Sequence, residues 1–411
     1  MPHNFLLVSG GSPGHVGPML AAAWQLRSRG HGVRFIARED AREAVEAAGY
    51  GFVSWQRTPS FTPIAREGNG DLHKAYDHLL FGPSAARAAD TRDEIDREPT
   101  DAVLVDIIVI GAALAAEAAS LPLALLSPTI SLRPLSGVPA LQSGLRPPRS
   151  PDEHAKVEAA NSRFAAVLNG WLPMLNGARA CMGLAPFDHM LDLFDRPARH
   201  LIAISAAFDF PADDLPGNLR YIGPMLDNGD WAAPWTVPWP RESGRPRALV
   251  SFSTTDQSQT DALQRTVNAI ARIEMDGVAT TGPALDPAKL RAPKNVTLLP
   301  SAPHDAVMRE VSLVVAHGGH GTVSRALWHG LPLLVMPMGR DQDDIALRVE
   351  FHGVGLILPP TASETDIAAA LNRLINEPHF RAAAQRLGAA IAGEIDAAPL
   401  VREMEEIVRS R

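Results

Sequence analysis

One glycine-rich stretch between two apolar runs constrains the fold of this chain more than any other feature. Residues 311–316 are predicted to form a buried strand, and the loop His-Gly-Gly-His-Gly-Thr follows at 317–322. A helix is predicted over 323–329 because Gly330 ends it, and 333–336 is a second apolar strand. Strand, loop, helix and strand in this order form the βαβ unit of a parallel sheet.

The loop has the chemistry of a phosphate site. Glycines let the backbone approach a ligand, and the start of a helix offers N–H groups and a positive dipole end. His317 and Thr322 can donate hydrogen bonds to phosphate oxygens. Asp341 and Gln342 follow the next strand at the same edge of the sheet, where their side chains can bind hydroxyl groups. The alternative is a tight turn whose glycines serve only packing, but phosphate and hydroxyl ligands together favour a sugar nucleotide.

These residues carry a family resemblance. His-Gly-Gly-x-Gly-Thr, with Asp-Gln about twenty residues later, resembles the donor signature of family-1 glycosyltransferases. That family includes plant UDP-sugar enzymes and bacterial macrolide and antibiotic glycosyltransferases. The resemblance implies an α/β chain of GT-B architecture, with two Rossmann-like βαβ domains facing each other across a cleft. It implies donor contacts by Ser253, Thr254, Ser301, Ala302, His317, Gly319, His320, Gly321, Thr322, Asp341 and Gln342.

A second glycine loop lies near the N-terminus, after a strand at 4–8 and before a helix predicted over 19–29. Its glycines do not form Gly-x-Gly-x-x-Gly, so a dinucleotide site and a nicotinamide dehydrogenase are disfavoured. In the family the histidine of this loop is the catalytic base, and here it is His15. The strand 102–106 ends in Asp106, which the resemblance makes the residue that orients His15. The structural alternatives are a helix cap for His15 and contacts to loop amides for Asp106.

Composition narrows the function classes. The formal net charge of −8 and the pI near 6.0 argue against nucleic acid as a partner. Cys181 is the single cysteine, so no internal disulfide forms and a reducing compartment is expected. The chain opens directly on a strand, and its longest apolar run, 102–116, is short and contains Asp106. No secretion signal or membrane span is therefore predicted, and a bacterial, cytoplasmic protein is expected.

Four regions are predicted along the chain. They are an acceptor-binding domain at 1–225, a Pro- and Trp-rich linker at 226–246, a nucleotide-sugar domain at 247–385, and a C-terminal helix at 386–411 that packs back on the first domain. Candidate acceptor contacts are Trp55, Phe61, Phe81 and Ser127. The alternative for these four residues is that they belong to ordinary surface loops and lid helices.

Two departures from the family pattern concern the nucleotide. Plant members carry Trp and Gln where this chain has Ser301 and His304, and a ribose-binding Glu where it has Arg325. A UDP-sugar is the favoured donor, with a dTDP-sugar as the alternative. Asp343 and Asp344 are interpreted as a solvated helix start, so neither a metal nor another cofactor is predicted.

The predicted function is an inverting, metal-independent transfer of a hexose to a hydroxyl group of a small lipophilic acceptor. No oligomeric state is predicted. The alternatives are a GT-B-fold sugar-nucleotide epimerase and a non-catalytic sugar-nucleotide- or lipid-binding protein. The apolar, proline-rich segment 128–150 argues against the epimerase, which needs no acceptor pocket. His15 and Asp106 argue against a pure binding protein, which needs no base.

Overall fold

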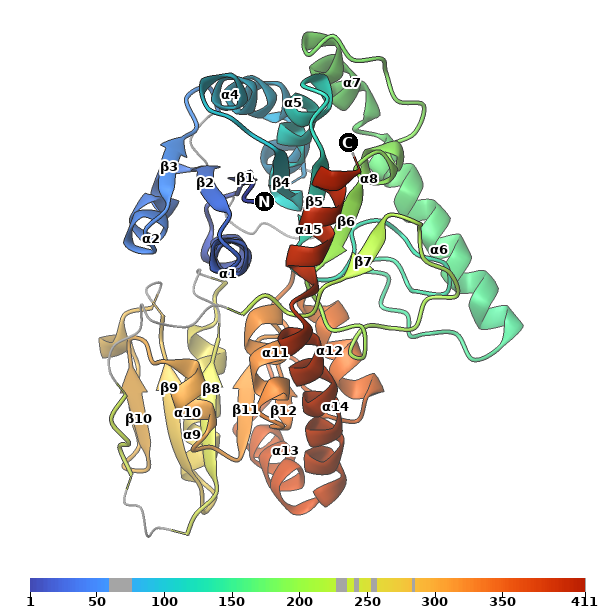
Figure 1. Ribbon diagram of the computed structural model, residues 1–411. Helices are drawn as coiled ribbons and strands as arrows, with labels where there is room; N and C mark the ends of the chain where they lie inside the picture. Colours follow the sequence, from blue (N-terminus) through green and yellow to red (C-terminus); the bar gives the residue numbers. More distant parts are fainter. Residues whose placement is uncertain (59–75, 227–234, 240–243, 253–256, 283–284, 411) are drawn as a thin grey trace.

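The chain folds into two parallel β-sheets, each flanked by helices (Figure 1). The structure is a computed structural model that describes residues 1–58, 76–226, 235–239, 244–252, 257–282 and 285–410. The first sheet has the order β3-β2-β1-β4-β5-β6-β7 and the second has the order β10-β9-β8-β11-β12-β13. The strands are β1 (Asn4–Val8), β2 (Gly32–Ala37), β3 (Gly51–Ser54), β4 (Ala102–Asp106), β5 (Leu123–Ser127), β6 (Arg199–Ile202), β7 (Leu219–Tyr221), β8 (Arg247–Ser251), β9 (Asp276–Thr280), β10 (Val296–Leu299), β11 (Leu313–Ala316), β12 (Leu333–Val335) and β13 (Gly355–Ile357).

Helices connect successive strands, as parallel pairing requires. In the first half they are α1 (Pro13–Ser28), η1 (Glu39–Ala41), α2 (Arg42–Ala47), the π-helix η3 (Asp77–Phe81), α4 (Ser84–Arg97), η4 (Ile107–Ala112), α5 (Ala113–Ala118), α6 (Pro151–Asn169), α7 (Leu172–Cys181) and α8 (Asp192–Asp195). In the second half they are α9 (Thr260–Ala271), η5 (Pro287–Lys289), α10 (His304–Met308), α11 (His320–Trp328), α12 (Gln342–Phe351), α13 (Glu364–Asn376), α14 (Pro378–Ala397) and α15 (Pro399–Arg409).

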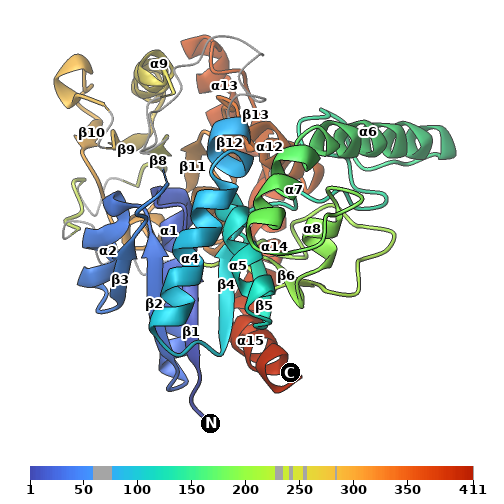
Figure 2. The same ribbon diagram turned by 90° about the horizontal axis from the view of Figure 1, so that it is seen from above.

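Both faces of the first sheet are covered, because its central strands are apolar at successive positions. Phe5 and Leu7 pack on the side of α1 and α15, whereas Leu6 and Val8 pack on the side of α4 and α5. The two helix layers lie on opposite faces of the sheet in Figure 1, and Figure 2 shows the same layers from above. This burial on both faces fixes where the strand ends point.

The second sheet is covered in the same way. One face packs on α9 and α13, and the other packs on α11 and α14. The cluster on the α11 side also contains Ile202 and Phe208 from the first half, so apolar packing is continuous between the halves. The expected GT-B architecture is confirmed.

Two helices begin earlier than the sequence predicted. Helix α1 begins at Pro13 and not at Met19, because Ser12 adopts an extended N-cap conformation and proline suits the first helical position. Helix α11 begins at His320 and not at Val323, directly after the capping Gly319. The prediction treated these glycine-rich segments as loops, yet their last residues form the first helical turns.

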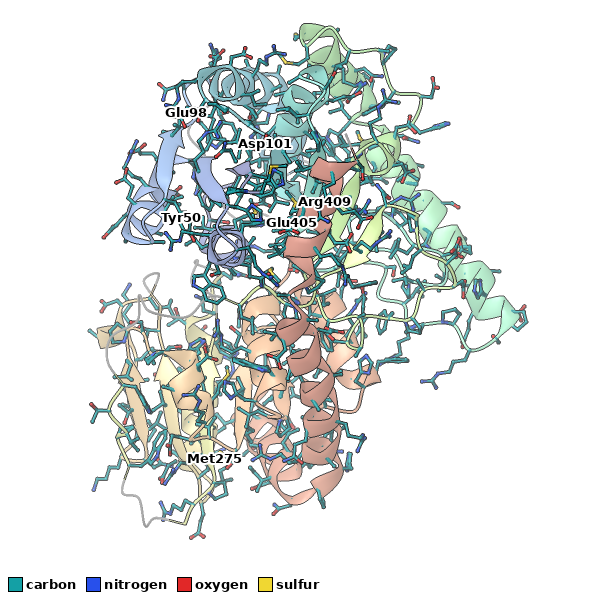
Figure 3. The ribbon with its side chains drawn as sticks, viewed as in Figure 1. Tyr50, Glu98, Asp101, Met275, Glu405 and Arg409 are labelled. Carbon is teal, nitrogen blue, oxygen red and sulfur yellow. The ribbon has the colours of Figure 1, made fainter. Side chains whose placement is uncertain are left out.

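The chain returns to the first sheet at its C-terminus. The C-terminal helix predicted at 386–411 belongs to two helices, α14 and α15, which are separated at Ala398 by a left-handed backbone with φ 41° and ψ 55°. Helix α14 packs on α11 and α13, and α15 packs on α1, β4 and β6. Glu405, labelled on α15 in Figure 3, lies 3.2 Å from Nε2 of His31 beside the first sheet. The last turn of α14 already contacts the first half, since Glu394 accepts the N–H of Ala207, and α15 then packs on the first sheet.

The two longest helices are long enough to cross a bilayer but are not apolar enough to do so. Helices α6 and α14 have 19 and 20 residues, but charged side chains recur along both. Across the described ranges, no helix combines the length and hydropathy of a membrane span.

Candidate functional site

His15 and Asp106 meet at the C-terminal edge of the first sheet. Asp106 ends β4 and is 1% exposed, and His15 lies in the first turn of α1. Nδ1 of His15 is 2.9 Å from Oδ1 of Asp106. The backbone N–H groups of Gly10 and Ile108 donate to the same carboxylate, at 3.3 and 3.2 Å. Because Asp106 accepts the proton on Nδ1, Nε2 is the nitrogen that can take a proton from a ligand.

Opposing effects set the pKa of His15. Burial lowers the pKa, but the charge and hydrogen bond of Asp106, with the charge of Asp341, outweigh it. The pKa of His15 therefore lies above its ordinary value. The side chain keeps 23% of its surface exposed, so a ligand can reach it. A reachable imidazole whose protonated form is stabilised suits a general base.

The glycines of the second loop differ in their surroundings. Gly318 has φ +97°, and a Cβ there would lie 2.9 Å from the carbonyl oxygen of Gln342. A Cβ on Gly319 would lie 2.7 Å from the ring of His317, whereas one on Gly321 would meet nothing within 4 Å. In the described part of the chain, no acidic residue and no side-chain cap occupies the first turn of α11. Its first N–H groups can therefore bind an anion.

The two histidines of this loop are neutral at pH 7. Burial lowers the pKa of His317 and of His320 to about 4, although the charge of Asp341 acts in the opposite direction. Nε2 of His320 lies 2.9 Å from Oγ of Ser324, so this side chain packs within its own helix. Nδ1 of His317 is buried and has no partner among the described residues. His317 can thus offer a hydrogen bond to a ligand.

Asp341 joins the two halves of the site. Its Oδ2 accepts a hydrogen bond from Oγ1 of Thr129, 2.8 Å away, and Thr129 follows β5 of the first sheet. The charge of Asp341 also contributes to the raised pKa of His15 and partly offsets the burial that lowers the pKa of His317 and His320. The C-terminal edges of both sheets therefore converge around this carboxylate, as expected where ligands of parallel α/β sheets bind.

Comparison with known proteins identifies the family. The family model "Glycosyltransferase family 28 N-terminal domain" matches residues 5–69, and "Erythromycin biosynthesis protein CIII-like, C-terminal domain" matches residues 264–407. The 4'-demethylrebeccamycin synthase of Lentzea aerocolonigenes is 26% identical over 404 residues, covering 91% of this chain and 92% of the relative. The zeaxanthin glucosyltransferase of Pantoea ananas is 27% identical over 419 residues, covering 95% and 93%. The chain is a GT-B-fold glycosyltransferase.

Solved structures support the fold of this glycosyltransferase over its whole length. The glycotransferase of kitacinnamycin superposes with a TM-score of 0.74 at 22% identity, covering 99% of this chain and 98% of that chain. The glycosyltransferase VinC, solved in complex with dTDP, gives 0.70 at 22% identity and the same coverage.

Gln342 of the glycosyltransferase does not face open space. It is 2% exposed, its Oε1 accepts from the N–H of Met338 at 2.7 Å, and its Nε2 donates to Oε1 of Gln257 at 2.9 Å. The expectation that its amide holds a sugar hydroxyl group does not agree with this geometry. The side chain instead fastens the segment that carries Asp341.

The candidate nucleotide contacts lie in different surroundings. Ser301 is partly exposed, whereas Ala302 is 2% exposed and belongs to the core. Arg325 is buried and bonds Asp305, which also lies 3.0 Å from Nε2 of His329. Burial raises the pKa of Asp305, but His329 and Arg325 outweigh it and hold the pKa below its usual range. Ser253 and Thr254 lie outside the described residues.

Two of the four candidate acceptor contacts are buried in the core. Phe81 has no exposed surface and stacks on Trp171 with ring centroids 5.4 Å apart. Ser127 is 1% exposed, and its Oγ lies 3.0 Å from Nε2 of His200. Neither can touch an acceptor in this structure, so both expectations are corrected. Trp55 is partly buried against the same cluster as Phe81, and Phe61 lies outside the described residues.

Sequence reasoning missed two residues that link the halves. Thr129 bonds Asp341, and the signal was a hydroxyl residue two positions after β5, at the ligand-binding edge. Asp344 is 5% exposed and accepts the N–H of Gln142, at 3.0 and 3.1 Å, so it is not a solvated helix residue. Burial raises the pKa of Asp344 to about 6.

One cluster in the described ranges has the residue types of a metal site. Ligand atoms of His154, Glu158 and Asp213 lie within 4.8 Å of one another. Nε2 of His154 is 2.8 Å from Oδ2 of Asp213, and Glu158 accepts the N–H of Gly137 at 3.0 Å. The Glu158 contact fastens the proline-rich segment 128–150 to α6, and the His154 contact fastens the loop that contains Asp213 to the same helix, which projects away from both sheets in Figure 1.

Proposed function

We propose that this glycosyltransferase transfers a hexose from a nucleotide sugar to a hydroxyl group of a small lipophilic acceptor, with inversion and without a metal. The observation that carries the proposal is the His15–Asp106 pair at the sheet edge, where Asp341 of the other half also lies. A binding protein or a donor-only epimerase has no need of a base oriented towards an acceptor.

In the proposed reaction, Nε2 of His15 takes the proton of the acceptor hydroxyl group. The acceptor oxygen attacks the anomeric carbon, and the bond from that carbon to the diphosphate breaks with its electron pair on the leaving nucleotide. Attack opposite the leaving group inverts the anomeric configuration. Asp106 stabilises the imidazolium that forms, as its effect on the pKa of His15 supports.

The donor diphosphate is placed at the first turn of α11. The helix dipole and free N–H groups stabilise the charge that develops on the leaving group, and neutral His317 adds a hydrogen bond. Open space beside Gly321 supports this placement. Asp341 is assigned to the sugar hydroxyl groups, and Gln342 is assigned to holding the Asp341 segment.

The donor is proposed to be a UDP-sugar. A dTDP-sugar is the alternative, because Arg325 stands where plant members have a ribose-binding Glu and its guanidinium bonds Asp305. The names of the two relatives, which contain rebeccamycin and zeaxanthin, support a small-molecule acceptor. The cytoplasm is the proposed location, since a chain with one cysteine suits a reducing compartment.

The test compares the wild type with His15→Ala and with a surface control, His379→Ala, whose side chain is 61% exposed. Melting with UDP-, dTDP- and GDP-sugars in EDTA first identifies the donor. A ligand at about 100 times its dissociation constant adds roughly 2.7 kcal/mol of stability. Turnover is then measured with that donor and a panel of hydroxyl acceptors.

His15→Ala is expected to keep the donor-induced shift and to lose about 10²–10⁴-fold in turnover, the usual contribution of a general base. His379→Ala should match the wild type in both measurements. Near-native turnover by His15→Ala would remove the base assignment. If the donor raises the melting temperature only after Mg²⁺ is added, the proposed metal independence is wrong. If no sugar nucleotide raises the melting temperature, the proposed donor site is wrong.

A further inference from the structure

Arg87 is a buried arginine that the proposed reaction does not use. It lies on α4, is 7% exposed, and points its guanidinium at backbone carbonyl groups. Its Nη1 donates to the carbonyl oxygens of Leu79 at 2.6 Å, Leu80 at 3.3 Å and Ile108 at 3.0 Å. One guanidinium thus fastens the π-helix η3 and the segment η4, which directly follows Asp106.

Ile108 connects Arg87 to the carboxylate of Asp106. The N–H of Ile108 donates to Oδ1 of Asp106 while its carbonyl accepts from Arg87. A Cβ on Gly10 would lie 2.4 Å from Cγ2 of Ile108, so Ile108 covers Gly10 closely. The N–H of Gly10 is the donor to Oδ2 of Asp106. Both amide donors on Asp106 therefore depend on where Ile108 lies.

The start of α4 packs closely against η4, so the two segments have little room to shift against each other. A Cβ on Gly111 would lie 2.3 Å from Cα of Ser84, so α4 and η4 meet backbone to backbone. Arg87 follows Ser84 by three residues and therefore lies on the same face of the helix. Burial lowers the pKa of Arg87, the charge of Asp106 partly offsets this, and the resulting pKa is about 10. Arg87 therefore stays protonated at neutral pH and attracts Asp106.

We propose that Arg87 is a positioning residue for the reaction, which holds Ile108 so that Asp106 stays within hydrogen-bonding distance of His15. The inference rests on the proposed function of His15 as the base. The proposed contacts run from the imidazole of His15 to the carboxylate of Asp106, then through the Ile108 peptide to the guanidinium of Arg87 on α4. A merely structural arginine would stabilise the fold without altering the titration of His15.

A double-mutant cycle tests this inference. Arg87→Met, Asp106→Asn and the double variant are compared for kcat and for the acid limb of the pH profile. Arg87→Met is expected to lower kcat about 10-fold, the order that misplacing a catalytic group costs. In the Asp106→Asn background the same change should cost less than about 2-fold, because it acts through Asp106. Both single variants should move the acid limb to lower pH, since the raised pKa of His15 depends on Asp106.

The matched control is Arg179→Met. Arg179 is also a buried arginine, 2% exposed, but it pairs with Glu117. Its loss should lower the melting temperature and leave kcat and the acid limb unchanged. If Arg87→Met does not fold, Arg87→Lys replaces it in the cycle under the same criterion.

The outcomes separate this inference from the proposed function. If Asp106→Asn turns over normally, Asp106 does not orient the base and the positioning role of Arg87 is overturned, whereas near-native turnover by His15→Ala would show that the proposed base is wrong. If Asp106→Asn is impaired but Arg87→Met costs the same in both backgrounds, or leaves the acid limb in place, the positioning role is overturned. A loss that is confined to the native Asp106 background, with a shifted limb, supports it.

Discussion

At the scale of single residues, Gly318 and Gly321 of the glycine-rich segment 317–322 have different structural requirements. Gly318 needs its missing side chain for the fold, because its φ is +97° and the carbonyl oxygen of Gln342 is close. The structure around Gly321 would accept a side chain, since this residue is exposed, lies in the first turn of a helix and has no atom within 4 Å of a Cβ. In the proposed function, the diphosphate of the donor approaches the N–H groups of this turn, and a side chain at 321 would lie in its path.

Gly321→Ala is therefore expected to raise stability and weaken donor binding. Alanine favours a helix over glycine by up to about 1 kcal/mol, whereas its methyl group occupies the approach to the first-turn N–H groups. Thermal melting and donor titration measure the two effects. Gly318→Ala is the counterpart and should lose at least about 1–2 kcal/mol of stability. Native donor affinity in Gly321→Ala would contradict this role for the loop.

At the scale of elements, helix α15 attaches the C-terminus of the chain to the first half. Apolar residues at 400, 401, 404 and 407 recur at helical spacing, and all are buried against the first sheet and α1. Helix α14 stays with the second sheet. The break between them is Ala398, which has a left-handed backbone, and Pro399 directly after it marks the position, because a proline ends a helix at the preceding residue.

Leu400→Ala is expected to destabilise the protein by about 2–5 kcal/mol, since Leu400 has no exposed surface. Arg402 lies two residues on with its side chain 73% exposed, so Arg402→Ala should change stability by less than about 0.5 kcal/mol. Urea unfolding measures both variants. Equal stability of Leu400→Ala and the wild type would mean that α15 does not pack on the first sheet in solution.

At the scale of the whole molecule, α12 carries two buried polar contacts between the halves. Arg348 and Asp209 form an ion pair at 2.7 Å with both side chains at most 3% exposed. Asp344 accepts the N–H of Gln142 nearby. The segment that supplies Asp341 is thus held against the first half by buried charges.

Asp344 makes this interface sensitive to pH. Its folded pKa of about 6 lies above the ordinary value, so its contribution to stability is present below about pH 4 and is lost as the pH rises through 6. Asp344→Asn cannot ionise and should lose less stability than the wild type between pH 5 and pH 8, by about 1.4 kcal/mol. Melting at both pH values tests this, and the exposed Asp343→Asn is the control. Parallel pH profiles for Asp344→Asn and the wild type would contradict the prediction.

The apolar patterns predicted the two βα units, and the family resemblance predicted that Asp106 orients His15. Asp106 ends β4, and His15 lies in the first turn of the helix that follows β1, so parallel pairing of β1 with β4 brings both residues to one edge of the sheet. Only the tertiary structure decided that Gln342, Phe81 and Ser127 are buried, and that Thr129 bonds Asp341 across 212 positions of the chain. The physical reason is that burial and partner choice depend on segments that pack from far away in the sequence, whereas strand ends are fixed by local apolar patterns.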